Sequence, residues 1–143
     1  MTRPPPGEGP IVLIVDDDRD MQRWAAALLE PSGYRVAFAP DAMLGMVKMR
    51  DLQPRVIVLD LAMPAGGGKI FLERVRELPA YRHIPIIVLS GRVTPEARAE
   101  LSELGITTVL EKPANPAVFV RAVHAAASAT SSPPPPPDTP ASA

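Results

Sequence analysis

Short apolar runs along the chain alternate with stretches in which apolar residues recur at helical spacing. The runs have the length and composition of strands, and they are Ile11–Val15, Tyr34–Ala39, Val56–Leu59, Ile84–Leu89 and Thr107–Leu110. Three of them, beginning at Ile11, Val56 and Ile84, are apolar almost throughout, which is typical of strands buried on both faces of a parallel sheet. The alternating run at Tyr34–Ala39 indicates a strand nearer an edge.

The stretches between and after these runs predict five helices, each with one apolar face. The first extends from Asp18 to Glu30, with Met21, Trp24, Ala25, Leu28 and Leu29 on its inner face. The second helix is capped by Asp41 and has Ala42, Gly45, Met46 and Met49 on its inner face, and the third follows a loop at Ala65–Gly68 and has Phe71, Leu72, Val75 and Leu78 inward. The fourth begins at Thr94 and Pro95, has Leu101 and Leu104 on its inner face and ends at Gly105. The fifth begins at Asn115 and Pro116, and its inner face carries Phe119, Ala122, Val123 and Ala126.

Five strands alternating with five helices predict right-handed crossovers and a parallel sheet covered on both faces. All strands of such a sheet point their carboxyl ends toward one edge, where open α/β sheets bind ligands. Polar residues that follow four different strands should therefore meet there: Asp16, Asp17, Asp60, Ser90 and Lys112. A run of aspartates or a Lys-Pro pair alone indicates little more than a turn, so the joint placement carries the prediction.

Composition narrows the class of protein. The chain of 143 residues has length for one domain, and its 15 basic and 16 acidic residues give no electrostatic case for nucleic acid or an anionic membrane. The absence of cysteine excludes thiol chemistry and Cys-based zinc sites and is compatible with a reducing compartment, so we expect a cytoplasmic protein. No apolar run reaches the ~18 residues of a membrane span, and the N-terminal residues have no apolar region of the kind found in signal peptides, so we expect neither feature.

The 19 prolines cluster toward the two ends of the chain. Residues 1–9 and 128–143 are proline-rich and lack the apolar residues of a core, so we expect both to be disordered. The single folded domain is then expected at residues 10–127.

Three carboxylates held together repel one another unless a cation lies between them. Oxygen ligands without histidine or cysteine favour a hard ion, and a partial cage of this kind suits Mg²⁺. Together with the hydroxyl of Ser90 and the ammonium group of Lys112, such a site contains the parts for phosphoryl transfer, with Asp60 as the attacking group.

Four segments carry a resemblance to a known family, and they read IVLIVDDD, VIVLDLAMP, IIVLSG and VLEKP in chain order. With them, the chain resembles the receiver domain of two-component response regulators over about residues 11–127. The resemblance implies the flavodoxin-like fold, a (βα)5 doubly wound parallel sheet with strand order 2-1-3-4-5. It also implies a Mg²⁺-dependent switch in bacterial phosphorelay signalling.

The resemblance assigns roles to individual residues. Asp60 is similar to the phosphoacceptor, which receives its phosphoryl group from phosphohistidine on a sensor histidine kinase or a phosphotransfer protein. The remaining roles are Mg²⁺ ligation by Asp16, Asp17, Asp60 and the backbone carbonyl of Ala62; phosphoryl contacts by Ser90 and Lys112; and a cis peptide bond between Lys112 and Pro113.

The chain departs from the family pattern at its output positions. An aromatic residue is usual three positions before the lysine and just after Lys-Pro, but this chain has Val109 and Ala114 there. Either the signal passes through the backbone around Ser90 or the switch is weak. The two positions that tune phosphoryl lifetime correspond to Ala62 and Arg92, and since the methyl group of Ala62 cannot orient a water molecule, we expect slow self-dephosphorylation.

We therefore expect a stand-alone receiver that is not an enzyme beyond self-phosphorylation and self-dephosphorylation. Its output would be binding to a protein target through the face around Val109, with Ser90 and Pro113 in the switch, as a monomer or weak dimer. One alternative is an interaction module that works without phosphorylation, a pseudo-receiver. Another is a phosphatase with an aspartyl-phosphate intermediate, which Ala62 opposes because that position commonly supplies a general acid.

Overall fold

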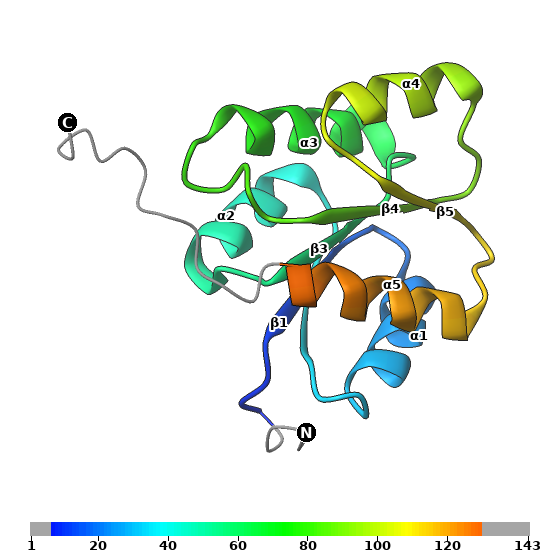
Figure 1. Ribbon diagram of the computed structural model, residues 1–143. Helices are drawn as coiled ribbons and strands as arrows, with labels where there is room; N and C mark the ends of the chain where they lie inside the picture. The colour runs from blue at the N-terminus through cyan, green and yellow to red at the C-terminus, as the bar shows by residue number, and fades with distance from the viewer. Residues whose placement is uncertain (1–6, 130–143) are drawn as a thin grey trace, which may run out of the picture.

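The computed structural model describes residues 7–129 and contains five strands and five α-helices in strict alternation (Figure 1). The strands form one parallel sheet with the order β2-β1-β3-β4-β5, so the predicted fold and strand order are confirmed. The elements are β1 (Ile11–Val15), α1 (Arg19–Leu29), β2 (Arg35–Ala39), α2 (Ala42–Leu52), β3 (Val56–Leu59), the 3₁₀ turn η1 (Pro64–Gly66), α3 (Gly67–Glu77), β4 (Ile86–Ser90), α4 (Pro95–Glu103), β5 (Thr108–Glu111) and α5 (Pro116–Ala129).

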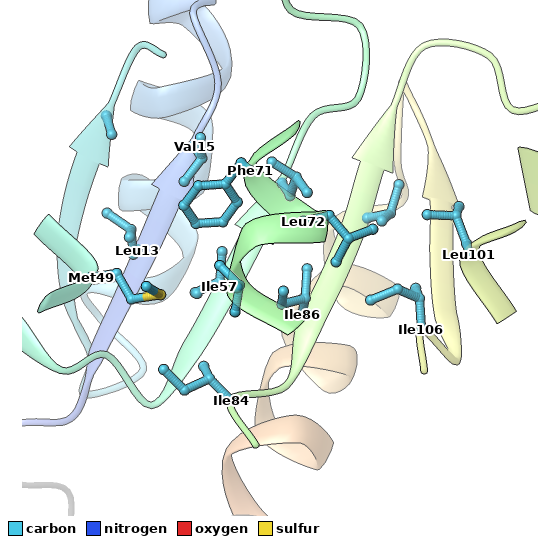
Figure 2. Packing of buried hydrophobic residues seen from close by; sticks show 14 of the residues in the cluster. Leu13, Val15, Met49, Ile57, Phe71, Leu72, Ile84, Ile86, Leu101 and Ile106 are labelled. Atoms are coloured by element: carbon cyan, nitrogen blue, oxygen red, sulfur yellow. The ribbon is translucent and has the colours of Figure 1, made fainter. Parts of the chain in front are cut away.

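The sheet is buried between two helical layers, with α1 and α5 on one face and α2, α3 and α4 on the other (Figure 1). Successive strand residues point to opposite faces, so the apolar runs supply side chains to both layers. Leu13 and Ile57 belong to the core beneath α2 and α3, whereas Val12 and Val58 belong to the core beneath α1 and α5. Figure 2 shows Phe71 and Leu72 of α3 packed over the first of these cores.

The strand boundaries differ slightly from those expected. β2 begins one residue later than predicted, while β5 and β4 are shifted toward their carboxyl ends. Pro85 has no N–H to donate to the ladder, and it contributes only its carbonyl, which accepts from Ile57 N at 3.0 Å. As a result β4 begins at Ile86, and Ser90 lies within the strand, paired with Glu111 of β5.

The predicted loop at Ala65–Gly68 is wrong in its second half. The 3₁₀ turn ends at Gly66, where φ is 69°, and α3 already begins at Gly67. A Cβ atom at Gly68 would lie 2.4 Å from the carbonyl oxygen of Asp60 and 2.6 Å from Cα of Leu61. The glycine therefore lets the first turn of α3 lie directly against the end of β3.

Helix ends follow the predicted chemistry. Asp18, Asp41, Thr94 and Asn115 each accept a hydrogen bond from a backbone N–H in the first turn of the helix that follows. Gly105, with φ of 80°, ends α4, and the backbone N–H groups of Gly105 and Ile106 donate to the carbonyls of Ser102 and Leu101.

The structure differs slightly from the prediction at the inner faces of the helices and at the end of the domain. In α2 only Gly45 and Met49 are fully buried, while Ala42 and Met46 are half-buried. α5 continues to Ala129, two residues past the expected end of the domain. Disorder is predicted for residues 1–9 and 128–143. Most of these, residues 1–6 and 130–143, lie outside the described residues. Within residues 7–129 no helix is long and apolar enough to span a membrane.

Candidate functional site

Asp60 is at the centre of the polar cluster at the carboxyl ends of the strands. It follows β3 directly and its side chain is buried. Oδ1 accepts from the hydroxyl of Ser90 at 2.7 Å and from the backbone N–H of Ala62 at 2.9 Å, and Oδ2 lies 3.4 Å from Nζ of Lys112. The carboxylate therefore has donors from β4, from the chain segment after β5 and from its own loop.

Asp16 forms the second buried carboxylate of the cluster. It follows β1, and Oδ1 accepts from the backbone N–H of Asp18 at 2.9 Å, while Oδ2 accepts from Nζ of Lys112 at 2.8 Å. Its backbone carbonyl accepts from the side chain of Gln22 at 2.8 Å. One ammonium group thus bridges the carboxylates of Asp16 and Asp60.

Asp17 is exposed, unlike the two buried carboxylates beside it. One carboxylate oxygen each from Asp16, Asp17 and Asp60 lie within 4.8 Å of one another. Asp17 therefore lies on the solvent side of the cluster, which is accessible from outside.

Burial and charge act in opposite directions on the groups of this cluster. Burial raises the pKa of Asp16, and this effect exceeds the lowering by the hydrogen bonds from Lys112 and Asp18. Burial lowers the pKa of Lys112, but its hydrogen bond to Asp16 and the charges of Asp16 and Asp60 outweigh burial, so the net pKa is raised. The negative charge of Asp16 is thus held at a cost that Lys112 only partly offsets.

The residues present fit a hard divalent cation. Three carboxylates converge and no histidine or cysteine belongs to the group, which is the donor set that Mg²⁺ prefers. Asp16, Asp17 and Asp60 would hold such an ion, and when bound it would supply positive charge to phosphoryl oxygens. The backbone carbonyl of Ala62, expected as a further ligand, belongs to an exposed residue whose N–H already contacts Asp60.

The backbone fixes Ser90 and Lys112 relative to each other. Ser90 is buried in β4, and its carbonyl accepts from the backbone N–H of Lys112 at 2.8 Å. The Lys112–Pro113 peptide bond is cis, as expected. The hydroxyl and the ammonium group thus approach Asp60 from adjacent strands whose register is set by the sheet.

The output positions lack aromatic rings at the places where the family pattern has them. Val109 is half-buried in β5 and packs against the core under α2 to α4, whereas Ala114 packs against the core under α1 and α5. Both are ordinary packing residues in this structure, and the face around Val109 remains a predicted output surface.

Two residues of the site carry no signal in the sequence pattern. Gln22 lies between apolar positions of α1 and reaches back to the carbonyl of Asp16, and Gly68 permits the close approach of α3 to Asp60. The glycine run marks Gly68 only as part of a turn, and nothing in the spacing distinguishes Gln22 from an exposed helix residue.

Comparison with known proteins agrees with the geometry. A family model described as the response regulator receiver domain matches residues 12–124. Over 112 residues the chain is 34% identical to an uncharacterized 14.6 kDa protein of Leptolyngbya boryana, a match that covers 78% of this chain and 86% of that protein.

Two further relatives are similar over the same region. A protein-glutamate methylesterase/protein-glutamine glutaminase of Anaeromyxobacter dehalogenans is 37% identical over 106 residues, which are 73% of this chain but 30% of that protein. The structure of the Vibrio cholerae chemotaxis protein CheY4 is similar with a TM-score of 0.77 and 30% identity, covering 82% of this chain and 98% of that one. The similarity thus covers most of the Leptolyngbya boryana protein and of CheY4, but less than a third of the methylesterase.

Proposed function

This chain belongs to the response regulator receiver domain family, and on that premise we propose that it accepts a phosphoryl group on Asp60 and transmits the change as altered binding to a protein partner. The observation that carries the proposal is the environment of Asp60. Its buried carboxylate is contacted by a hydroxyl group from β4 and by an ammonium group from the segment directly after β5. A carboxylate that merely capped a loop would not need these two contacts.

In the proposed step, an oxygen of Asp60 attacks the phosphorus atom of a phosphohistidine on a sensor histidine kinase or phosphotransfer protein. The new O–P bond forms as the N–P bond breaks, and the bonding electron pair leaves with the imidazole nitrogen. Lys112 neutralises negative charge on the transferred oxygens, and the hydroxyl of Ser90 donates to one of them. Mg²⁺, held by Asp16, Asp17 and Asp60, would supply the remaining positive charge.

The same arrangement opposes a phosphatase. Rapid hydrolysis of an aspartyl phosphate needs a residue that orients water or donates a proton, and Ala62 has neither group. We therefore propose that the chain has at most self-phosphorylation and slow self-dephosphorylation activity.

A second candidate is a pseudo-receiver, which binds its partner without phosphorylation. The observation that favours it is the pair Val109 and Ala114, which pack as ordinary core residues and provide no ring that could change orientation. The complete set of Asp16, Asp60 and Lys112 favours the phosphoacceptor instead.

The test is an intact-mass measurement after incubation with an acyl phosphate donor and Mg²⁺. The phosphoacceptor predicts one phosphoryl adduct on the wild type and none on Asp60→Asn, with the same circular dichroism spectrum for both. A folded wild-type chain that binds Mg²⁺ but gains no mass would overturn the proposal and favour the pseudo-receiver.

A further inference from the structure

A hollow lies on the rim of the sheet opposite Asp60, where α3 and α4 end and β4 begins. It has a volume of about 480 Å³, and its lining includes Arg76, Arg82, His83 and Glu103. Ile84 also lines the hollow, and Figure 2 shows it at one end of the core to which Leu101 and Ile106 belong. Nothing in the proposed phosphoryl transfer uses this region.

The guanidinium of Arg76 is fixed in the wall of the hollow. Nε donates to the carbonyl of Leu104 at 2.9 Å, and Nη1 donates to the carbonyls of Arg82 and Ile84 at 2.9 and 3.1 Å. These contacts join α3 to the end of α4 and to the segment before β4. The planar group is therefore held in one orientation before any ligand arrives.

The charge of Arg76 has no matching carboxylate. Its three acceptors are neutral carbonyls, and within residues 7–129 no Asp or Glu oxygen is within 4.0 Å of its guanidinium. Burial lowers the pKa of Arg76, as expected for a cation that lacks a negative partner. Arg76 is half-buried, and its partners are carbonyls instead of the carboxylate that an ion-pair arginine has.

One terminal nitrogen of Arg76 remains available. Nη2 makes no hydrogen bond to the described part of the chain, and no buried side-chain nitrogen there lacks a partner, so Nη2 faces solvent. The exposed side chains of Arg82 and His83 line the same hollow, against the single acid Glu103. The two arginines therefore bring more positive charge to the space than the one carboxylate, that of Glu103, brings negative charge.

We propose that this hollow is a second ligand site, which takes a small molecule carrying a phosphate or carboxylate group. Arginine donors bind both oxyanions through short, charge-assisted hydrogen bonds. A donor that is already held in place loses little conformational freedom when it binds. The volume is within the ~300–1,000 Å³ of small-molecule sites.

The test is a titration followed by the backbone amide shifts of the full chain in two-dimensional NMR, with inorganic phosphate and, separately, succinate. Mg²⁺ is left out, so that the carboxylates of Asp16, Asp17 and Asp60 repel both probes from the other rim. We expect saturable shifts at His83, Ile84 and Gly105 with at least one probe, and the probe that binds more tightly identifies the preferred oxyanion. Shifts that rise linearly without saturation, or that appear only around Asp60, would overturn the proposal.

The matched variants separate binding from folding. Arg82 and His83 are exposed, so the double substitution Arg82→Gln and His83→Gln should leave the fold intact and weaken binding by about tenfold. Arg76→Lys keeps the charge but not the planar group, and it should also weaken binding while an unchanged circular dichroism spectrum shows a folded chain. Wild-type affinity in both variants would show that Arg76 only joins α3 to α4.

Discussion

Lys112 is the residue on which the balance of charge at the site depends. Its ammonium group lies 2.8 Å from Asp16 and 3.4 Å from Asp60, so one cation serves two buried carboxylates. Because burial nevertheless raises the pKa of Asp16, ionisation of this carboxyl group is less favourable in the folded protein than in the unfolded chain. A group whose function needs negative charge thus lowers the free energy of unfolding of the protein that contains it.

Since Lys112 keeps Asp60 as a partner, this cost predicts that Asp16→Asn stabilises the metal-free protein at neutral pH by about 1 kcal/mol. The pKa of Asp16 in the folded state is above its ordinary value of 3.8. At a pH between these two values, the folded state therefore binds more protons than the unfolded state. The contribution of Asp16 to stability therefore falls as the pH rises through the folded-state pKa, and stays low at neutral pH. Urea unfolding of the wild type and Asp16→Asn with a chelator, at acidic and neutral pH, measures the difference.

Addition of Mg²⁺ provides the control for this prediction. The ion should raise the midpoint of unfolding of the wild type by mass action and have little effect on Asp16→Asn, which lacks one carboxylate of the site. A variant that is less stable than the wild type in chelator at neutral pH would contradict the argument.

Ala62 determines a second prediction at the same scale, about the lifetime of the phosphorylated state. Its N–H contacts Asp60, but its methyl group cannot orient a water molecule. Ala62→Asn adds an amide at an exposed position, so we expect self-dephosphorylation to become faster by about tenfold. Loss of the adduct over time by intact mass gives the rate. Ala62→Leu, similar in size but apolar, should remain as slow as the wild type, and equal rates in all three proteins would refute the role of Ala62.

At the scale of elements, the contact between α3 and the end of β3 depends on one glycine. A Cβ atom at Gly68 would meet backbone atoms of Asp60 and Leu61 at 2.4 and 2.6 Å, whereas at Gly67 it would meet side chains at an ordinary 3.7 Å. Gly68→Ala must displace either α3 or the phosphoacceptor segment. We expect it to reduce the free energy of unfolding by about 1–3 kcal/mol.

Gly67→Ala is the matched control for this change. It adds the same methyl group one residue earlier in the same helix, where it should be neutral or stabilising by ~0.4–1 kcal/mol. Urea unfolding monitored by circular dichroism compares the two variants. Equal stabilities would show that the contact of Gly68 with Asp60 is not tight in solution.

The elements also show what the sequence could predict and where it failed. Strand and helix identities, the helix caps and the gathering of Asp16, Asp60, Ser90 and Lys112 follow from local patterns and from the geometry of parallel sheets. The apolar pattern predicts the start of β4 two residues too early, because it continues through Ile84 and Pro85, although Pro85 has no N–H for the ladder. The glycine run predicts a loop at Gly68, because the close contact of Gly68 is with Asp60, eight residues earlier, and sequence spacing does not reveal such an approach.

At the scale of the whole molecule, α4 is the helix with the weakest apolar attachment. Leu101 is its single fully buried residue, whereas α3 buries four. Its other anchors include the hydrogen bond from Arg76 to the carbonyl of Leu104 and two largely exposed ion pairs, of Lys69 with Glu100 at 2.9 Å and of Arg98 with Glu111 at 3.8 Å. Exposed ion pairs add little stability, so α4 is held less firmly than its neighbours.

We therefore expect the amides of α4 to exchange with deuterium faster than those of α3, by about tenfold or more. Phosphorylation of Asp60 should change exchange in α4 through the segment after Ser90, since Val109 has no ring to carry the signal. Hydrogen exchange followed by mass spectrometry, with and without an acyl phosphate donor, measures both effects, and Asp60→Asn should show no response to the donor. Equal protection of α3 and α4 would contradict this view of the molecule.

The packing of α1 against α5 has a practical consequence. Trp24 of α1 lies with its ring centroid 4.9 Å from that of Phe119 of α5. α1 begins just after the acidic residues that follow β1, and α5 begins just after Lys112 and Pro113. A shift of either helix changes the surroundings of this indole, and the chain contains one tryptophan. The fluorescence emission of Trp24 can therefore follow events at the carboxyl ends of the strands in real time without an added label.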